Sequence, residues 1–121
     1  MELIGLAHVQ LAIPVGEEDR AREFFLGLLG LQEVPKPPAM AKRGGAWFAG
    51  PGFQIHIGGE ADFRPARKAH PALVVSNLAA CRARFEEAGY PTRDADKVPG
   101  VERFHVDDPF GNLLEFLERE R

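Results

Sequence analysis

The chain has 121 residues, of which 45% are hydrophobic and 27% are charged, so it is long enough to form one globular domain with a buried core. Its 15 basic and 18 acidic residues give a net charge of −3, which favours neither a nucleic acid nor a membrane surface as a partner. We expect no membrane helix, which needs ~20 apolar residues, and no secretory leader. The single cysteine excludes an internal disulfide. These features predict one cytoplasmic domain that spans residues 1–121.

The first predicted strand covers residues 6–14, whose sequence LAHVQLAIP alternates between two faces. Its apolar residues, at every second position from 9 to 13, must face a helix. His8 and Gln10 therefore point to the opposite side of the strand. A helix is predicted over residues 21–29, because apolar residues recur there at helical spacing and Gly30 is suited to follow its last turn.

The remainder of the first half predicts a loop followed by a hairpin. The stretch KPPAMAKRGG, residues 36–45, is rich in proline and glycine and is expected to be a loop. The next stretch, GAWFAGPGFQIHIG, predicts a hairpin that turns at residues 50–52. His56 alternates with two isoleucines, so it points away from the face that packs on the helix, and Gln54 shares that direction.

The second half of the chain repeats the landmarks of the first half in the same order. His70 repeats His8 after 62 residues, and the glycines that end the helix and turn the hairpin recur after 59 residues. At this second spacing, Glu115 falls on the position of His56. Several matches in a common order favour an internal duplication.

This duplication predicts an α+β fold made of two βαβββ modules, at about residues 3–58 and 69–119. In the second module, HPALVV predicts the first strand, residues 78–88 a helix and ERFHVDDPFGNLLEFLE a hairpin. Cys81 lies on the apolar face of this helix, so we assign it to core packing.

The second hairpin predicts a cluster of titratable residues. If it turns through residues 108–112, His105 lies beside Glu115 on one face. A carboxylate in the strand NLLEFLE is costly to bury without a partner. All four histidines of the chain belong to separate strands and to one set of faces. This pattern is typical of a metal site built across a sheet from imidazole and carboxylate ligands.

The two modules, with the phrases LAHVQLAI, FFLGLLG, AHPALVV and DPFGNLLEF, resemble the vicinal oxygen chelate superfamily over nearly the whole chain. This superfamily includes glyoxalase I, the extradiol dioxygenases and bleomycin-binding proteins. The resemblance implies a glyoxalase-like fold, in which curved mixed sheets surround a shared metal-binding cup. It also implies a divalent ion (Mn, Ni, Co, Fe or Zn) that a small substrate chelates through two adjacent oxygens. Carried over by position, the implied ligands are His8, His70 and Glu115, with His56 at the fourth position.

His56 departs from the family pattern, because glyoxalase I has a glutamate at this position and methylmalonyl-CoA epimerase a glutamine. The resemblance therefore leaves three functions open. The first is a metal-dependent lyase or isomerase, with Glu115 or His105 as the catalytic base. The second is an Fe(II)-dependent extradiol dioxygenase, with His56 as the acid–base group. The third is a protein that sequesters a drug or metabolite without chemistry, as bleomycin-resistance proteins do.

Two glutamines share faces with the implied ligands. Gln10 and Gln54 either orient the ligands or the substrate through hydrogen bonds or are polar residues of the wall. We also predict a homodimer, because the outer strands of the sheets lack a terminal extension that would cover them. Members of the superfamily are commonly dimers, and whether the site forms within one chain or between two is left open.

Overall fold

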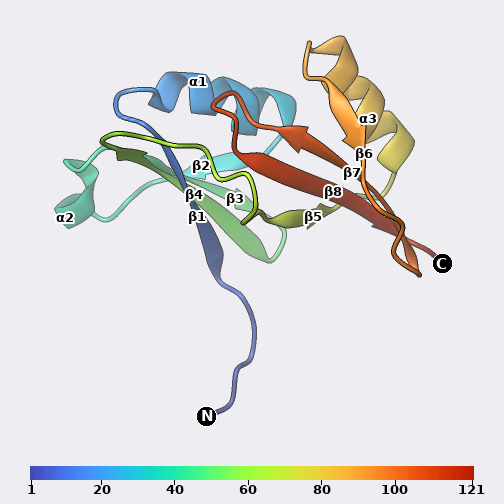
Figure 1. Ribbon diagram of the computed structural model, residues 1–121. Coiled ribbons are helices and arrows are strands. Elements are labelled where there is room, and N and C mark those ends of the chain that lie inside the picture. The colour runs from blue at the N-terminus through green and yellow to red at the C-terminus, as the bar shows by residue number, and fades with distance from the viewer. The chain divides into compact units, whose positions relative to one another are not determined.

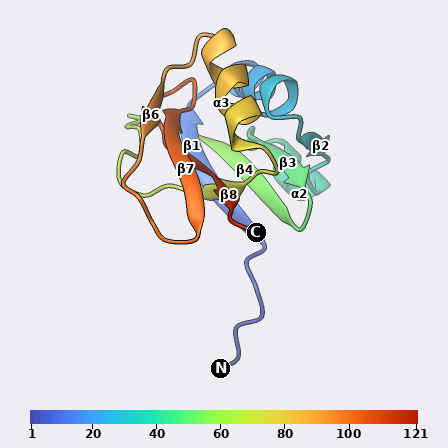
Figure 2. The ribbon, with the colours of Figure 1, turned by 90° about the vertical axis from the view of Figure 1, so that its right-hand side faces the viewer.

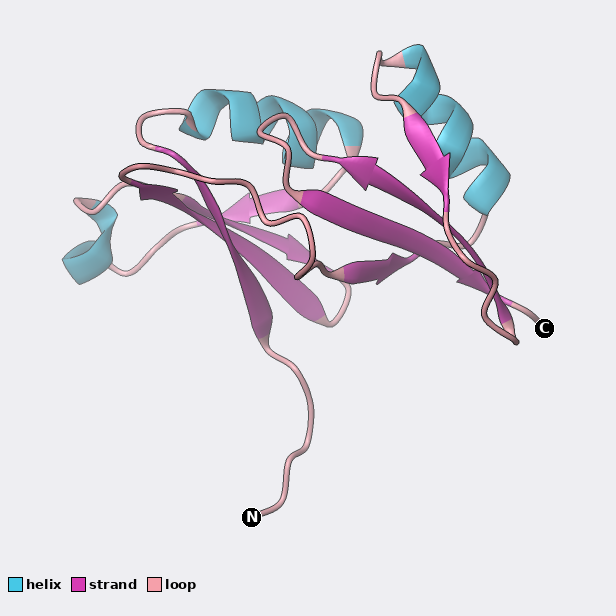
Figure 3. Ribbon diagram, viewed as in Figure 1, coloured by secondary structure: helices cyan, strands magenta, loops and turns pink.

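The computed structural model describes residues 1–121, which divide into two compact units, Met1–Arg64 and Pro65–Arg121. Each unit is built on one four-stranded sheet that contains parallel and antiparallel pairs, accompanied by few helices (Figure 3). The predicted α+β class and the βαβββ order of both modules are confirmed. None of the helices combines the length and the apolar character that crossing a bilayer requires.

The first unit contains, in chain order, β1 His8–Pro14, α1 Glu18–Arg22, the π-helix η1 Glu23–Leu28, β2 Gln32–Val34, α2 Pro38–Ala41, β3 Ala46–Gly50 and β4 Phe53–Glu60. Its strands have the order β1-β4-β3-β2, with β1 parallel to β4 and the other pairs antiparallel. Residues 1–7 precede β1 as an extended arm, and α1 lies over one face of the sheet (Figure 1). The predicted hairpin is confirmed, since Gly50 pairs with Phe53 across the turn.

The second unit contains β5 Ala72–Val74, α3 Leu78–Glu87, β6 Thr92–Asp94, β7 Val101–Asp107 and β8 Leu113–Arg119. Its strand order, β5-β8-β7-β6, repeats that of the first unit, again with the first strand parallel to the last. The helix α3 lies against the sheet (Figure 2). The two units therefore have one topology, as the repeat in the sequence predicted.

Each sheet buries one apolar face against its helices. In the first unit the buried side chains are Leu11, Ile13, Ala21, Phe24, Phe25, Ala46, Phe48, Ile55 and Ile57. In the second unit they are Phe85, Phe104, Val106, Leu114 and Phe116. Because side chains of a strand alternate, the residues between these apolar positions lie on the other face of each sheet. That other face carries His8, His56 and His105, whereas His70 precedes β5.

The predicted helix over residues 21–29 differs from the structure in its type. It is α-helical over Glu18–Arg22 and then widens into the π-helix η1, in which the Leu29 N–H donates to the Phe24 carbonyl at 3.0 Å. Apolar residues spaced by three and four positions fit both kinds of turn, so the sequence could not distinguish them. Gly30 follows with a φ of 77°, which confirms its predicted place after the last turn.

The stretch 36–45 was expected to be a loop, and this expectation was incomplete. It contains the short helix α2, Pro38–Ala41, which begins at a proline, a residue well suited to the first helical position. A helix of 4 residues carries no periodic signal, so only its proline could have indicated it. Gly45, with a φ of 80°, approaches the Ile57 backbone so closely that a Cβ would clash there.

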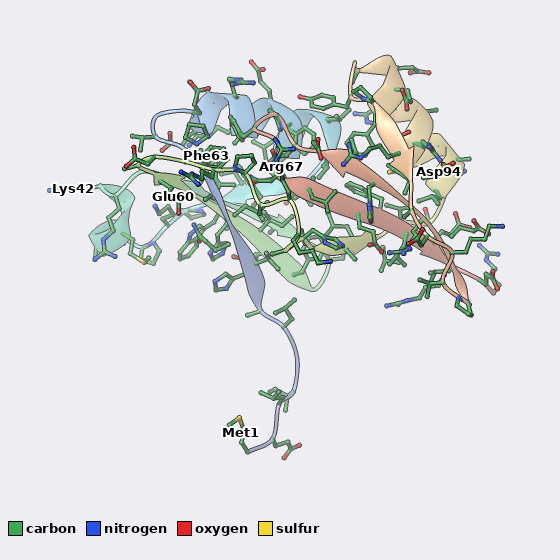
Figure 4. All side chains as sticks on the ribbon, viewed as in Figure 1. Met1, Lys42, Glu60, Phe63, Arg67 and Asp94 are labelled. Atoms are coloured by element: carbon green, nitrogen blue, oxygen red, sulfur yellow. The ribbon has the colours of Figure 1, made fainter.

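A helix was predicted over residues 78–88, and α3, Leu78–Glu87, confirms it. The Asn77 side chain caps its first turn by accepting a hydrogen bond from the Ala80 N–H at 3.0 Å. Cys81 on this helix is partly buried, and burial raises the pKa of its thiol to about 11, so the thiol stays protonated at neutral pH. A partly buried, protonated thiol is consistent with the predicted role of Cys81 in core packing. Asp94 of β6 lies beside the helix (Figure 4), where its carboxylate pairs with Arg82 at 2.8 Å.

Candidate metal centre

Glu115 occupies the middle of β8 and is 5% exposed. Its neighbours Leu114 and Phe116 are buried in the core, so the Glu115 side chain points from the opposite face of the sheet. On the adjacent strand β7, His105 is the direct partner of Glu115, as predicted from the hairpin. The imidazole Nε2 of His105 lies 3.2 Å from Oε1 of Glu115.

The register of this hairpin is fixed by the turn DPFGN, which contains two buried polar residues. One Asp108 carboxylate oxygen accepts hydrogen bonds from the N–H groups of Phe110 and Asn112, at 2.8 and 2.9 Å. The Asn112 side-chain oxygen accepts one from the Ala66 N–H at 2.9 Å. Burial raises the pKa of Asp108, although the hydrogen bonds from Asn112 and Phe110 oppose this effect. The turn thus places His105 opposite Glu115.

His70 lies just before β5, the strand parallel to β8. Its Nδ1 is 2.9 Å from the Lys68 carbonyl oxygen, and its Nε2 is 3.1 Å from Oε1 of Glu115. A carbonyl oxygen only accepts, so Nδ1 carries a proton and donates it. This backbone contact orients the ring and directs Nε2 to the carboxylate, an arrangement common among histidines that bind metals.

A third donor, which the sequence analysis did not identify, reaches the same carboxylate oxygen. Nη1 of Arg103 lies 2.9 Å from Oε1 of Glu115. Arg103 precedes His105 by two positions on β7, so strand alternation places both on one face. The alternation that identified His105 could therefore also have indicated Arg103.

These contacts determine the charge of Glu115. Burial alone would raise the pKa of its carboxyl group. The hydrogen bonds from His70 and His105, together with the charge and hydrogen bond of Arg103, outweigh burial and hold this pKa below its ordinary value. Glu115 is therefore an anion at neutral pH, with three nitrogen donors around one oxygen.

The donor set fits a divalent transition-metal ion. His70, His105 and Glu115 each offer one ligand atom, and these atoms all lie within 4.8 Å of one another. Ligands ~2.1 Å from one ion lie about 3.0 Å apart at a right angle and about 3.4 Å apart at the tetrahedral angle. The separations of 3.1 and 3.2 Å between the imidazole nitrogens and Oε1 fall in this range. The group includes His105, which was predicted as a base, beside the predicted ligands His70 and Glu115.

The first unit brings together the other two predicted ligands, His8 and His56. Their rings stack with centroids 4.0 Å apart, and the Trp47 indole stacks on His56 at 4.2 Å. Because both neighbours are nearly parallel to His56, they cover its opposite faces. Trp47 was also missed from the sequence, although a hairpin turning at residues 50–52 makes it the direct partner of His56.

The protonation state of His56 follows from this stack. Its side chain is buried at 6% exposure, and its Nε2 donates to the Gln54 side-chain oxygen at 2.8 Å. Burial lowers the pKa of His56, and the charges of His8 and Lys36 lower it further. His56 is therefore neutral at neutral pH, with its lone pair on Nδ1.

The two predicted glutamines take different positions. Gln54 bonds directly to His56, and its role beside a ligand or a substrate stays a prediction. Gln10 is the strand partner of His56 on β1 and is exposed. Each unit thus gathers its own share of the predicted residues: His8, Gln10, Gln54 and His56 in the first, and His70, His105 and Glu115 in the second.

Comparison with known proteins identifies the family. Residues 5–116 match the model of the Glyoxalase/Bleomycin resistance protein/Dioxygenase superfamily, so the chain belongs to this superfamily. It contains many enzymes and also binding proteins without enzymatic activity. Its members typically bind metals, and they bind small molecules. No protein of curated function matches the chain.

Three solved structures share the fold. A glyoxalase family protein from Bacillus anthracis is 42% identical, with 99% of this chain and 98% of that chain covered and a TM-score of 0.94. A glyoxalase/dioxygenase from Nostoc punctiforme is 18% identical over 97% of this chain and 92% of that chain, with a TM-score of 0.79. An antibiotic binding protein from Streptomyces is 18% identical over 99% of both chains, with a TM-score of 0.76.

Proposed function

We propose that this protein is a divalent-metal-dependent lyase or isomerase of the glyoxalase type, which acts on a small substrate with vicinal oxygens. The observation that carries the proposal is the convergence of His70 and His105 on one oxygen of the buried anion Glu115. Imidazole and carboxylate groups are donors that Mn, Ni, Co, Fe and Zn ions accept in proteins.

The tautomer of His70 supports a cation at this position. Its Nδ1 proton is donated to the Lys68 carbonyl, so a neutral ring has its lone pair on Nε2. In this neutral ring the lone pair faces Oε1 of Glu115 at 3.1 Å, and the hydrogen bond to Glu115 forms only when Nε2 carries a proton. Two lone pairs at this distance repel each other unless a proton or a metal ion lies between them. A divalent ion bound by His70 and Glu115 satisfies both groups.

The residues proposed to hold the ion are His70 and Glu115, with His105 adjacent to both. That His8 and His56 bind the same ion stays a prediction from the sequence repeat and the family resemblance. For His56, the hydrogen bond to Gln54 leaves Nδ1 as the nitrogen with the lone pair. A bound divalent ion supplies Lewis acidity, which stabilises negative charge on the substrate oxygens.

The chain's own residues supply the proton transfer. Glu115 is ionised and can accept a proton from a carbon atom next to the substrate oxygens. His105 Nε2, 3.2 Å from the same oxygen, can take that proton on or return it to a neighbouring carbon. A base that gives back the proton it takes suits an isomerase or a lyase better than a hydrolase.

A second candidate function is sequestration of a small molecule without a metal. One observation favours it, because the ion pair with Arg103 already balances the charge of Glu115. The antibiotic binding protein from Streptomyces has the same fold. The two candidates differ in whether a divalent ion is required for ligand binding.

The experiment is a screen of the metal-free protein, prepared with a chelator, against compounds with vicinal oxygens. Each compound is tested alone and after addition of Mn²⁺, Ni²⁺, Co²⁺, Fe²⁺ or Zn²⁺, with thermal shift and product formation as readouts. We expect stabilisation and turnover only with an ion. Ligand binding that no ion improves would contradict the proposal and support sequestration. Oxygen uptake with catechols and Fe²⁺ would instead support the extradiol reaction.

We also propose that the protein is a homodimer. The strands β1 and β5 lie at sheet edges, and four of the large exposed apolar residues, Met1, Leu3, Ile4 and Leu6, belong to the arm that precedes β1. Sedimentation at micromolar concentration is expected to give twice the chain mass of 13.3 kDa. A single species of 13.3 kDa would contradict the dimer.

A further inference from the structure

Arg103 holds a position in the candidate metal centre that the proposed mechanism does not use. Its Nη1 bonds Oε1 of Glu115 at 2.9 Å, and its Nε donates to the Asp96 carbonyl oxygen at 2.9 Å. The side chains of Arg103 and Glu115 are 19% and 7% exposed, so water screens this pair only partly. The guanidinium is thus anchored at one end by backbone and directed at the carboxylate.

The oxygen that Arg103 occupies is also the one on which His70 and His105 converge. A carboxylate oxygen that binds a divalent ion places two positive charges next to any guanidinium bonded to the same oxygen. In a site that excludes most water, this repulsion is strong. Arg103 and a divalent ion therefore compete for Oε1 of Glu115.

The structure also provides a place for a displaced guanidinium. Arg103 lines a pocket of about 240 Å³ within the second unit. Three acidic residues, Asp94, Asp96 and Glu102, line the same pocket together with two other basic ones, Arg82 and Lys97. Arg82 already pairs with Asp94 at 2.8 Å. The other charged residues of the lining are Asp96, Glu102 and Lys97.

We propose that Arg103 is an internal competitor that sets the metal affinity of the site. It neutralises Glu115 in the metal-free protein and leaves Oε1 for the pocket that it lines when a divalent ion binds. The inference rests on the proposed metal site. It makes Arg103 a positioning residue, because it acts on the ion through Glu115. Removing its charge is expected to tighten metal binding, whereas loss of a purely structural support would weaken it.

The test is calorimetric titration of the metal-free protein with Ni²⁺ and, separately, with Mn²⁺. Arg103→Met removes the charge and keeps much of the side-chain volume. Arg22→Met is the matched control, since it removes an arginine from a carboxylate pair of the first unit, Arg22–Glu33 at 2.9 Å. Arg103→Met is expected to lower the Kd for the ion about tenfold or more, from the loss of a neighbouring like charge. The control is expected to stay within about twofold of wild type.

Arg103→Lys keeps the charge but cannot bridge Glu115 and Asp96 with a planar fork, so it is expected to bind the ion about threefold more tightly than wild type. This variant carries the test if Arg103→Met does not fold. An unchanged or weaker affinity in the folded variants would overturn the inference while leaving the proposed function intact. No ion binding by wild type or by either variant would overturn both.

Discussion

The two units place different chemistry on the same backbone plan. His56 on the last strand of the first unit corresponds to Glu115 on the last strand of the second. Each pairs with a residue of the parallel first strand of its unit. Across the hairpin, Trp47 in the first unit corresponds to His105 in the second. One unit builds a stack of aromatic rings around the neutral imidazole of His56, and the other a charged cluster around a carboxylate.

The difference shows how side chains at matched positions determine protonation. Burial between two rings lowers the pKa of His56, so its ring stays neutral. Glu115 is buried as well, but three nitrogen donors lower its pKa, so it stays charged. A neutral imidazole and an anionic carboxylate are both in the form that binds a metal ion. The duplication has therefore produced two kinds of ligand environment from one topology.

The largest expected effect concerns His105, which has no histidine counterpart in the first unit. His105→Gln keeps a hydrogen-bonding group but removes the titration. If His105 transfers a proton, turnover on an identified substrate should fall by ~10²-fold or more, while the bound metal remains. Steady-state kinetics and metal content of the same preparation measure this. Unchanged turnover at every pH would mean that His105 is only a strand residue.

The next effect compares the two hairpin turns. Asp108→Ala removes the acceptor of two N–H groups in the buried turn of the second unit, and each lost acceptor costs about 1–3 kcal/mol. Urea unfolding should therefore show a loss of about 3 kcal/mol. The matched change is Pro51→Ala in the exposed turn of the first unit, which should cost less than about 1 kcal/mol. Equal losses would show that the buried turn does not stabilise the second unit.

The smallest effect is the pH dependence of His56 protonation in the first unit, measured through the fluorescence of the chain's single tryptophan, Trp47. Because the pKa of His56 is lowered from 6.5, the unfolded chain binds a proton first as the pH falls. Neutral His56 therefore makes its full contribution to the free energy of unfolding above pH 6.5. This contribution is lost as the pH falls towards the pKa of His56 in the folded protein. Trp47 stacks on His56, so its fluorescence in metal-free protein should report protonation with a midpoint below 6.5.

The control for this titration is His56→Gln, which removes the titrating ring and should abolish the transition of Trp47. A midpoint at or above 6.5 in the wild-type protein would contradict the effect of burial on His56.

Much of the fold was predictable because alternation and helical spacing are local properties of the sequence. The pairing of His105 with Glu115 followed from the length of one turn. By the same rules Arg103 and Trp47 could have been found, but neither is a usual metal ligand. Their contacts with Glu115 and His56 depend on side-chain rotamers, which no period in the sequence encodes. The short helix α2 and the π-helix η1 carry no distinguishing period.

The central claim is that the second unit binds a divalent ion through Glu115, and metal content tests it most directly. Wild-type protein is reloaded with Mn²⁺, Ni²⁺, Co²⁺, Fe²⁺ or Zn²⁺, desalted and analysed beside Glu115→Gln and the exposed control Glu87→Gln on α3. We predict close to one ion per chain in the wild type and in Glu87→Gln, and a small fraction of that in Glu115→Gln. Equal metal content in wild type and Glu115→Gln for all five ions would contradict the claim.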